Sequence, residues 1–226
     1  MVDFEKASRK AQEFRQRGEL ILRCAEKLFL EKGEDKVTVE MIAEEAGIGK
    51  GTIYKHFESK DEIYLQLMIR YDDELATLFD NIETTDDKDR LAKDYFMFRM
   101  REPDRYALYD RLEDKLSTEN SMPTLLEELH RVRASNQDKL EQIISARIAE
   151  GKLADVPPNY HIGAAFALVH GAVALIRSEF YKKYMTDDGF FDFLMEVALR
   201  MGNRAHLPDA VALGGRNSAD EESNDD

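Results

Sequence analysis

The chain of 226 residues lacks the features of a secreted, disulfide-built or membrane-spanning protein. A single cysteine, Cys24, excludes an intramolecular disulfide framework and fits a reducing interior. Its position among apolar residues favours a packing role over redox sensing. The N-terminus is charged and has no apolar segment typical of a secretory signal. The longest apolar run, 162–176, is interrupted by His170 and is shorter than the roughly 20 residues of a membrane span. We therefore expect a cytoplasmic protein with no membrane partner.

Motifs of catalysis and metal binding are also missing. The sequence has no His-Glu-x-x-His pair, no Walker loop and no Gly-x-Ser-x-Gly elbow. Among its five histidines, His161 and His170 are nine residues apart and have no cysteine pair beside them. A metal site is therefore disfavoured, and a satisfied core position is the preferred interpretation of His170. We expect no enzyme activity, no catalytic residue, no metal and no cofactor.

Strand patterns are scarce, and the fold class that remains is all-α. No strong alternation of apolar and polar residues occurs, and the turn-forming pair Asp-Gly occurs once, at 188–189. Apolar residues recur instead at helical spacing, and no internal repeat is found. We expect a first helix that ends at Gly33, a second capped by Thr38, a third that begins near Lys50, and later helices over about 59–82, 88–101, 104–116, 123–150, 160–184 and 190–204.

The strongest signal lies at residues 38–60, TVEMIAEEAGIGKGTIYKHFESK. Apolar residues at helical spacing mark a short helix, Gly47 permits a tight turn, and three apolar anchors mark a second helix. This order predicts a helix-turn-helix whose second helix enters a DNA groove. The outward side chains of that second helix are hydrogen-bond donors, as contact with phosphates and base edges requires: Lys50, Thr52, Tyr54, Lys55 and His56.

The start of the second helix is where base edges would be in reach. Lys50 suits guanine, and Thr52 can donate a hydrogen bond or place its methyl group against thymine. Gly51 permits close approach to the groove floor or serves as a helix-start turn, and both roles remain open. Glu40 is expected to be a favourable charge at a helix start, with acceptance from a cytosine as a lesser alternative.

Residues 17–67 resemble the tetracycline-repressor (TetR) family of transcriptional regulators. The resemblance rests on the first helix, Thr38, the run IAEEAGIGKGTIYKHF and the SK pair at 59–60. It implies an N-terminal three-helix DNA-binding head joined by a long helix to a larger helical body. By this resemblance, Lys55 matches a variable position that often faces DNA. Some relatives, including the tetracycline repressor itself, have a basic residue at the position of Glu40. Four residues match family positions that contact the phosphate backbone: Thr38, Tyr54, His56 and Lys60.

Charge and composition suggest three regions. Residues 1–60 contain 12 basic and 12 acidic side chains, whereas the remainder holds 20 and 34 and accounts for the net charge of −14. We expect a DNA-binding domain over 1–62, in which residues 1–17 extend the first helix or form a flexible arm. A ligand-binding and dimerisation domain over 63–207 should follow, with an acidic disordered tail over 208–226.

The body offers material for a dimer interface and for a pocket. Small and large apolar residues of the last two helices suit a homodimer built as a four-helix bundle, unless both helices are simply monomer core. We expect the interface to include Ala164, Leu168, Gly171, Leu175, Phe190, Leu194 and Val197. A pocket for an apolar or amphipathic effector, rather than plain core packing, would use Phe96, Met97, Met100, Tyr106, Tyr109, Phe166 and His170. An anionic effector would need one of four arginines: Arg99, Arg101, Arg105 or Arg147.

Three functions are compatible with the sequence. The first is a dimeric repressor that a small molecule releases from a palindromic double-stranded DNA operator. The second is a ligand-independent DNA-binding or structural protein of the same fold. The third is an all-helical enzyme or carrier with a vestigial head. The sequence favours the first.

Overall fold

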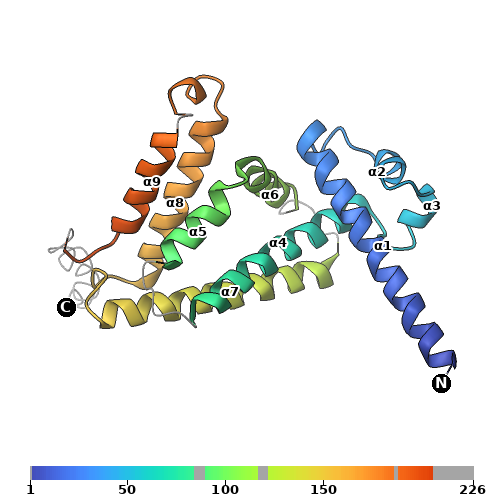
Figure 1. Cartoon of the computed structure of the whole chain (residues 1–226), viewed down its shortest axis with the longest axis horizontal. Helices are drawn as coiled ribbons and strands as arrows, with labels where there is room; N and C mark the ends of the chain where they lie inside the picture. The colour runs from blue at the N-terminus through green and yellow to red at the C-terminus, as the bar shows by residue number, and fades with distance from the viewer. Residues whose placement is uncertain (1, 84–89, 117–121, 186–187, 206–226) are drawn as a thin grey trace, which may run out of the picture. The chain divides into compact units, whose positions relative to one another are not determined.

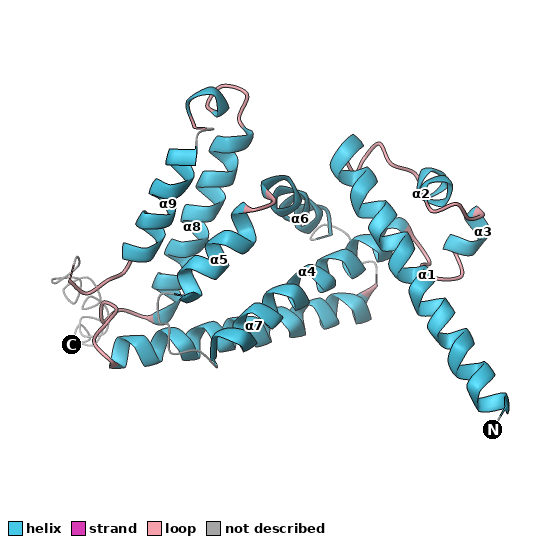
Figure 2. Cartoon of the chain, viewed as in Figure 1, coloured by secondary structure: helices cyan, strands magenta, loops and turns pink. Residues whose placement is uncertain are grey.

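The computed structural model describes residues 2–83, 90–116, 122–185 and 188–205, and most of these are helical (Figures 1 and 2). Within these ranges the β-structure is limited to an isolated bridge between Leu153 and Asn203, so the expected all-α fold is confirmed. The elements are α1 (Val2–Lys32), α2 (Val39–Glu45), α3 (Lys50–Ile53), α4 (Lys60–Glu83), α5 (Arg90–Met100), α6 (Pro103–Leu116), α7 (Pro123–Ala149), α8 (Pro158–Arg177), the 3-10 helix η1 (Lys182–Tyr184) and α9 (Asp188–Arg200).

Of the two alternatives for residues 1–17, extension of the first helix agrees with the structure, in which α1 begins at Val2. Residues 2–17 contain neither proline nor glycine and are rich in helix-forming residues. One expectation about a helix end was wrong. The helix expected over 160–184 ends at Arg177, where Ser178 takes an extended conformation, and only η1 follows. The expected acidic tail, 208–226, lies outside the described residues.

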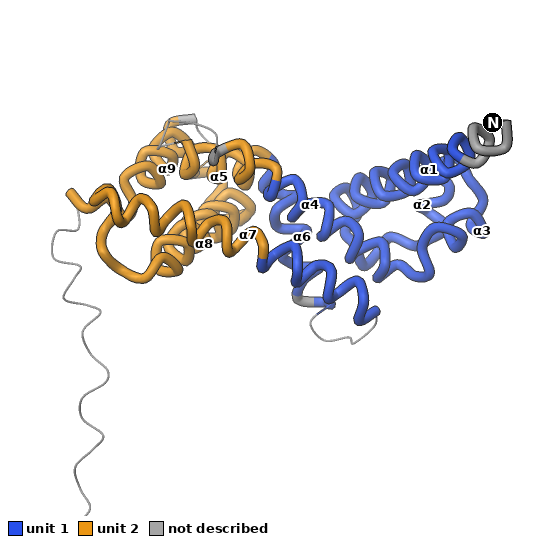
Figure 3. The backbone as a smooth tube through the Cα atoms, turned by 90° about the horizontal axis from the view of Figure 1, so that it is seen from below, with its two compact units in different colours: residues 1–76, 102–134 blue, residues 77–101, 135–226 orange. Residues whose placement is uncertain are grey.

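The chain packs as two compact units, coloured separately in Figure 3. Unit 1 comprises Met1–Ala76 and Glu102–Ala134, and unit 2 comprises Thr77–Arg101 and Ser135–Asp226. The boundaries of these units differ from the expected boundary between the DNA-binding and ligand-binding domains at residue 62, because α6 and the first half of α7 belong to the same unit as the head. The functional division of the chain stays a prediction.

Unit 1 is organised around Arg105 of α6. Its guanidinium donates to Glu26 of α1 at 2.6 Å and to both carboxylate oxygens of Glu74 of α4 at 2.7 and 2.9 Å. It also lies over the rings of Tyr71 and Tyr109, which stack at 4.4 Å between centroids. Burial and the nearby Glu26 carboxylate raise the pKa of Tyr109, whose hydroxyl donates to Glu26 at 2.6 Å. One side chain thus joins three helices of the unit.

The loop between α1 and α2 is held in the same unit by Glu34, which is buried. Arg111 of α6 donates to both carboxylate oxygens of Glu34 at 3.1 Å, and the Tyr64 hydroxyl of α4 donates to its carbonyl at 3.1 Å. Burial alone would raise the pKa of Glu34, but the Arg111 hydrogen bonds lower it overall. The carboxylate therefore stays ionised at neutral pH and fixes the start of α2.

Unit 2 packs α5 against both α8 and α9. Tyr95 and Phe96 of α5 face Phe166 of α8 and Phe191 of α9, with ring centroids 5.7 and 5.5 Å apart. Among the described helices, α8 is the one with the length and hydropathy of a membrane span, a test that the core helix of a soluble protein can also pass. The 20 residues of α8 exceed the run considered above because the helix begins at Pro158.

A clasp joins the connection between α7 and α8 to the end of α9. The amide of Ala154 donates to the Gly202 carbonyl at 2.9 Å, and the amide of Arg204 donates to the Lys152 carbonyl at 3.2 Å. The His161 Nε2 lies 3.0 Å from the Ala154 carbonyl, which requires this nitrogen to carry the proton. Gly202 has φ of +74°, and a Cβ there would lie 2.3 Å from the His161 Nδ1. Only glycine satisfies both constraints.

We expect Gly202→Ala to destabilise the protein by about 2–4 kcal/mol, since it adds left-handed strain to a steric clash. The thermal unfolding midpoint, followed by far-UV circular dichroism, measures the loss. Gly163→Ala is the matched control, because a Cβ there meets no atom within 4 Å. Equal midpoints for the two variants would show that the clasp contributes nothing to stability.

Candidate nucleic-acid interface

The helix-turn-helix is built by α2, a glycine turn and α3. Thr38 caps α2, since its hydroxyl oxygen accepts from the Met41 amide at 3.3 Å. Gly47 has φ of +64° and lets the chain reverse, after which the Ile48 amide donates to the Ala43 carbonyl at 2.9 Å. Ala43 is buried, and its small side chain permits a close crossing of the two helices.

The second helix is short but continues as a helical turn. α3 covers Lys50–Ile53, and the amides of His56 and Phe57 both bond to the Ile53 carbonyl, at 2.8 and 2.9 Å. Ile53 and Phe57 are buried as anchors, as their spacing predicts. A Cβ on Gly51 would meet no atom within 4 Å, and its φ is not positive. The fold therefore does not require glycine at this position. This weakens the interpretation of Gly51 as a helix-start turn and favours the other role, close approach of the helix to a DNA groove.

Several expected donors lie on the solvent side of this motif. Lys50, Tyr54 and Lys55 are exposed and Thr52 is half-buried, so their polar ends are accessible to a duplex. The Lys50 ammonium also lies 5.7 Å from the centroid of the Tyr54 ring. This surface can offer ammonium, hydroxyl and phenol groups to phosphates and base edges.

Lys50 has an intramolecular partner that the sequence did not reveal. Its ammonium donates to a carboxylate oxygen of Glu40 at the start of α2. This hydrogen bond lowers the pKa of Glu40 and raises the pKa of Lys50, so both groups are charged at neutral pH. Helix-start stabilisation is therefore not the whole role of Glu40. Any DNA contact by Lys50 has to compete with this carboxylate.

His56 lies beneath Phe14 of α1, a contact with no signal in the helix-turn-helix pattern. The two rings stack with centroids 4.0 Å apart, and a Cβ on Gly18 would lie 3.6 Å from the His56 Nδ1. Burial, together with the charge of Arg17, lowers the pKa of His56. The imidazole is therefore neutral at pH 7 and can donate one hydrogen bond.

Lys60 faces the protein in this structure. Its ammonium donates to the carbonyls of Glu34 and Val37 at 3.1 and 3.2 Å and lies 5.4 Å from the Tyr64 ring centroid. An ammonium has three donors, so a phosphate contact through the third stays a prediction. Ser59 and Glu62 have the spacing of a capping box, but only half of it forms. Ser59 accepts from the Glu62 amide at 3.1 Å, whereas the Glu62 carboxylate accepts from the Glu58 amide.

Comparison with known proteins identifies this head. The family described as "Bacterial regulatory proteins, tetR family" matches residues 21–67, which include the whole motif. Residues 21–67 are therefore similar to the DNA-binding head of the TetR family. The structure of a TetR-family regulator from Agrobacterium tumefaciens covers 84% of this chain and 99% of its own, with a TM-score of 0.63 and 21% identity. Another, from Rhodococcus RHA1, covers 82% and 96%, with a TM-score of 0.64 and 16% identity. At these identities the likeness shows the fold alone.

Sequence relatives match about a third of this chain. The uncharacterized HTH-type transcriptional regulator YuxN of Bacillus subtilis (strain 168) is 37% identical over 78 residues, 34% of this chain and 27% of that protein. An HTH-type transcriptional regulator of Staphylococcus aureus (strain USA300) is 41% identical over 73 residues, 32% and 38% of the two chains. The match thus spans about a third of these relatives. They are transcriptional regulators rather than enzymes, which agrees with the missing catalytic motifs.

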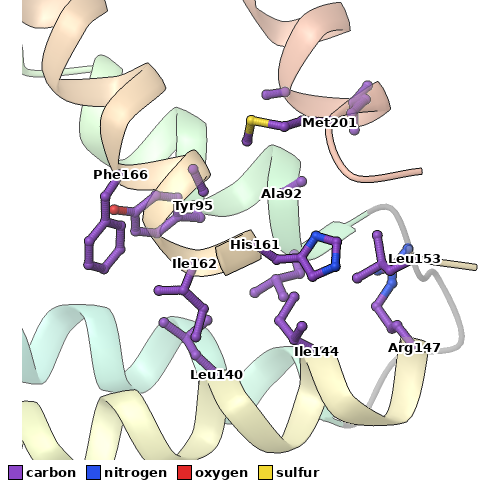
Figure 4. Close-up of a pocket in the computed structure, with 14 residues that line it drawn as sticks. Ala92, Tyr95, Leu140, Ile144, Arg147, Leu153, His161, Ile162, Phe166 and Met201 are labelled. Atoms are coloured by element: carbon purple, nitrogen blue, oxygen red, sulfur yellow. The ribbon is translucent and has the colours of Figure 1, made fainter. Parts of the chain in front are cut away.

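A cavity of about 100 Å³ lies in unit 2, between α5, α7, α8 and α9, and is partly open to solvent (Figure 4). Of the seven expected pocket residues, only Phe166 lines it. Phe96 and Met100 are buried, and Met97 is exposed. The two tyrosines, 106 and 109, belong to the core of unit 1. The cavity is lined by Leu91, Ala92, Tyr95, Leu140, Ile144, Arg147, Leu153, His161, Ile162, Ala165, Phe166, Ala198, Leu199 and Met201.

The histidine assignments also need correction. His170 is exposed and not a core residue, because it lies on the outer side of α8 with its Nδ1 3.0 Å from the Phe166 carbonyl. His161 is the histidine at the cavity. Among the described residues no group of three His, Cys, Asp or Glu side chains could hold a metal ion. Cys24 is half-buried, and burial raises the pKa of its thiol, which fits packing better than redox chemistry.

The seven expected interface residues differ in exposure. Leu194 is buried within unit 2 and cannot contribute area to a partner. Leu168, Leu175 and Phe190 are half-buried. Ala164, Gly171 and Val197 are exposed, together with Ala167, Ala174 and Phe193, whose side chain is 64% exposed.

We expect Phe14→Ala to raise the pKa of His56 toward its ordinary value of about 6.5, because the substitution removes much of the burial that lowers it. Arg17→Gln should raise it as well, by removing a repulsive charge. NMR titration of the imidazole Hε1 signal, assigned with His56→Gln, measures both shifts. Leu30→Ala is the control, an exposed apolar residue of the same helix. A His56 pKa that does not move in Phe14→Ala refutes the stacking account.

Proposed function

We propose that the chain is a homodimeric, DNA-binding transcriptional regulator, and that it acts in the cytoplasm as a repressor released from a palindromic operator by a small apolar or amphipathic ligand. The observation that carries the proposal is the helix-turn-helix with an exposed donor surface on α3. The relatives that share this head are transcriptional regulators.

Recognition of DNA would divide between base edges and phosphates. Lys50 and Thr52, at the start of α3, are the candidates for base contact, with Gly51 between them allowing the helix backbone to approach the groove. Tyr54, Lys55 and the neutral His56 are candidates for phosphate contact, as are Thr38 and Lys60. Eight phosphate contacts in a dimer would weaken binding about 10⁴-fold between 50 and 200 mM salt.

A dimer through α8 and α9 is supported by their exposed apolar surface. α8 presents small residues, Ala164, Ala167 and Gly171, that would let a second helix approach closely. α9 adds Phe193 and Val197, both exposed to solvent in the single chain. A two-fold pair of these helices would form a four-helix bundle, and a palindromic operator would require the two recognition helices to lie about 34–36 Å apart.

The cavity in unit 2 favours a ligand-responsive regulator over the ligand-independent alternative, because a purely structural DNA-binding protein has no need of it. A ligand that binds one arrangement of the heads better than another would change operator affinity about 5- to 150-fold through a coupling of about 1–3 kcal/mol. α4 belongs to both units, so it is a candidate for carrying that coupling.

Two substitutions on the α2–α3 surface should move operator affinity in opposite directions. Glu40→Gln frees Lys50 and removes a negative charge, so binding should tighten about three- to tenfold. Gly51→Ala holds the helix backbone away from the groove, and binding should weaken at least about tenfold. Fluorescence anisotropy with fragments from upstream of its own and adjacent genes, at fixed salt, measures both.

Thermal unfolding provides the control, since both residues are solvent-exposed. Glu40→Gln should leave the midpoint unchanged, and Gly51→Ala should leave it unchanged or raise it, because alanine favours helix by about 1 kcal/mol. A wild-type protein that binds every fragment equally, with neither variant altering affinity, would rule out sequence-specific DNA recognition by α3.

The dimer should dissociate in Phe193→Glu, because the substitution places a charge in the middle of the proposed apolar interface. Sedimentation velocity would show the shift from dimer to monomer. Phe180→Glu is the matched control, a phenylalanine that is 62% exposed but lies between α8 and η1. A Phe193→Glu protein that stays dimeric would place the interface elsewhere, and a monomeric wild type would exclude the dimer.

A further inference from the structure

The N-terminal half of α1 extends beyond the core of the head. Residues 8–17 are all exposed, and the buried residues of α1 begin only at Ile21. The segment is polar around its whole circumference except for Ala11 and Phe14, so it has no apolar stripe that could pack against the head. Packing within the head therefore does not explain why the chain keeps these turns helical and exposed.

This segment differs from the rest of the chain in the sign of its charge. Residues 8–17 contain four basic side chains and one acidic side chain, a net charge of +3, whereas the whole chain has a net charge of −14. The acid, Glu13, accepts from Arg9 at 2.9 Å. The other basic side chains, all exposed, are Lys10, Arg15 and Arg17. A basic segment with so little apolar surface suits a polyanion better than an apolar protein partner.

One face of this segment lies beside the helix-turn-helix. The Phe14 ring stacks on His56 with centroids 4.0 Å apart, so the side of α1 that carries Phe14 faces the end of that motif. Lys10 and Arg17 lie four residues before and three residues after Phe14, which places them on the same side of the helix. The charge of Arg17 is close enough to His56 to lower the pKa of the imidazole. Figures 1 and 3 both show α3 and the N-terminal half of α1 at the same end of unit 1.

The positions of Lys10 and Arg17 fit a row of phosphates. Their seven-residue spacing is about 10 Å along the helix axis, whereas successive phosphates of one DNA strand are about 3.4 Å apart along the duplex axis. The two side chains can thus reach different phosphates. His56, which lies beside this face, is itself a candidate for phosphate contact, so a duplex bound at α3 would pass close to α1 as well.

We propose that residues 8–17 form a second DNA-binding element, in which Lys10 and Arg17 bind backbone phosphates next to those bound by α3. The proposal rests on the DNA-binding function proposed above and extends the binding surface to α1. Ammonium and guanidinium groups bind phosphate oxygens without reading the bases, so this element adds affinity for any duplex and leaves the choice of sequence to α3.

Fluorescence anisotropy of the full-length protein tests the proposal. The probes are the upstream fragment that the wild type binds most tightly and a random-sequence duplex of the same length. Lys10→Gln and Arg17→Gln should each weaken binding about 3- to 30-fold, by the same factor on both probes. Each should also reduce the slope of log K against log salt concentration by about 1.8, which corresponds to one phosphate contact per protomer of a dimer. Lys10→Gln is the more direct variant, because Arg17→Gln also shifts the pKa of His56.

Three further variants separate this contact from general electrostatics. Arg23→Gln removes the same charge from an exposed position nine residues after Phe14, on the opposite side of α1, and should change affinity by less than about twofold. Lys10→Arg should bind as the wild type does, since the charge and the donors are kept. Ala11→Pro makes the helix begin after Lys10 and should weaken binding as much as Lys10→Gln does, because the contact needs the helical placement. Far-UV circular dichroism verifies that each variant is folded.

The proposal is overturned if Lys10→Gln binds both probes as the wild type does, if Arg23→Gln causes an equal loss, or if Ala11→Pro keeps full affinity. The result is separable from that of the proposed function. Preference for the upstream fragment with no loss in Lys10→Gln would preserve the regulator and remove the second element. Equal wild-type binding to both probes, with a loss in Lys10→Gln, would preserve the basic element and remove sequence-specific regulation.

Discussion

The contact on which unit 1 depends most is the one that Arg105 makes with Glu26 and Glu74. It joins α6 to the first helix of the head and to α4, and its side chain is 15% exposed. Because its two carboxylate partners come from different helices, movement of either helix breaks a charge-assisted hydrogen bond at a partly buried site. Arg111 and Glu34 repeat this arrangement at the loop that precedes α2. We therefore expect the head, α6 and the start of α4 to move together as one rigid body.

This rigid body affects how ligand binding in unit 2 would be coupled to DNA binding by the head. A lever made of α4 alone would let the head rotate on one helix, but the ion pairs from α6 resist such rotation. The chain passes between the units within α4, between α5 and α6, and within α7. A ligand in unit 2 would thus act through three covalent connections, and the whole of unit 1 would respond together. The cavity touches α5 and α7, two of the elements that lead into these connections.

The head was predictable from sequence because its determinants are local. Apolar spacing, the Thr38 cap and the glycines at 33 and 47 each act within a few residues, and all appear in the structure. The cavity was not predictable in the same way. Tyr109 has the amphipathic character of a pocket residue, but its hydroxyl is used by Glu26, 83 positions away. Leu140 and Met201, which do line the cavity, have no distinguishing signal, because only the packing of distant helices brings them together. Likewise, nothing in the pattern of residues 38–60 indicates that Phe14 covers His56.

The pairing of Lys50 with Glu40 has a consequence for discrimination between DNA sites. In the proposed DNA complex, Glu40 would compete with phosphate for the Lys50 ammonium, so the pair would persist while the protein is free or bound to arbitrary duplex. A site that offers only backbone charge exchanges one anion for another and gains little. A site that presents well-placed guanine acceptors gives the lysine a better partner and leaves the carboxylate to solvent. The pair would thus weaken adherence to bulk genome more than capture of the cognate sequence, and so widen the ratio between them.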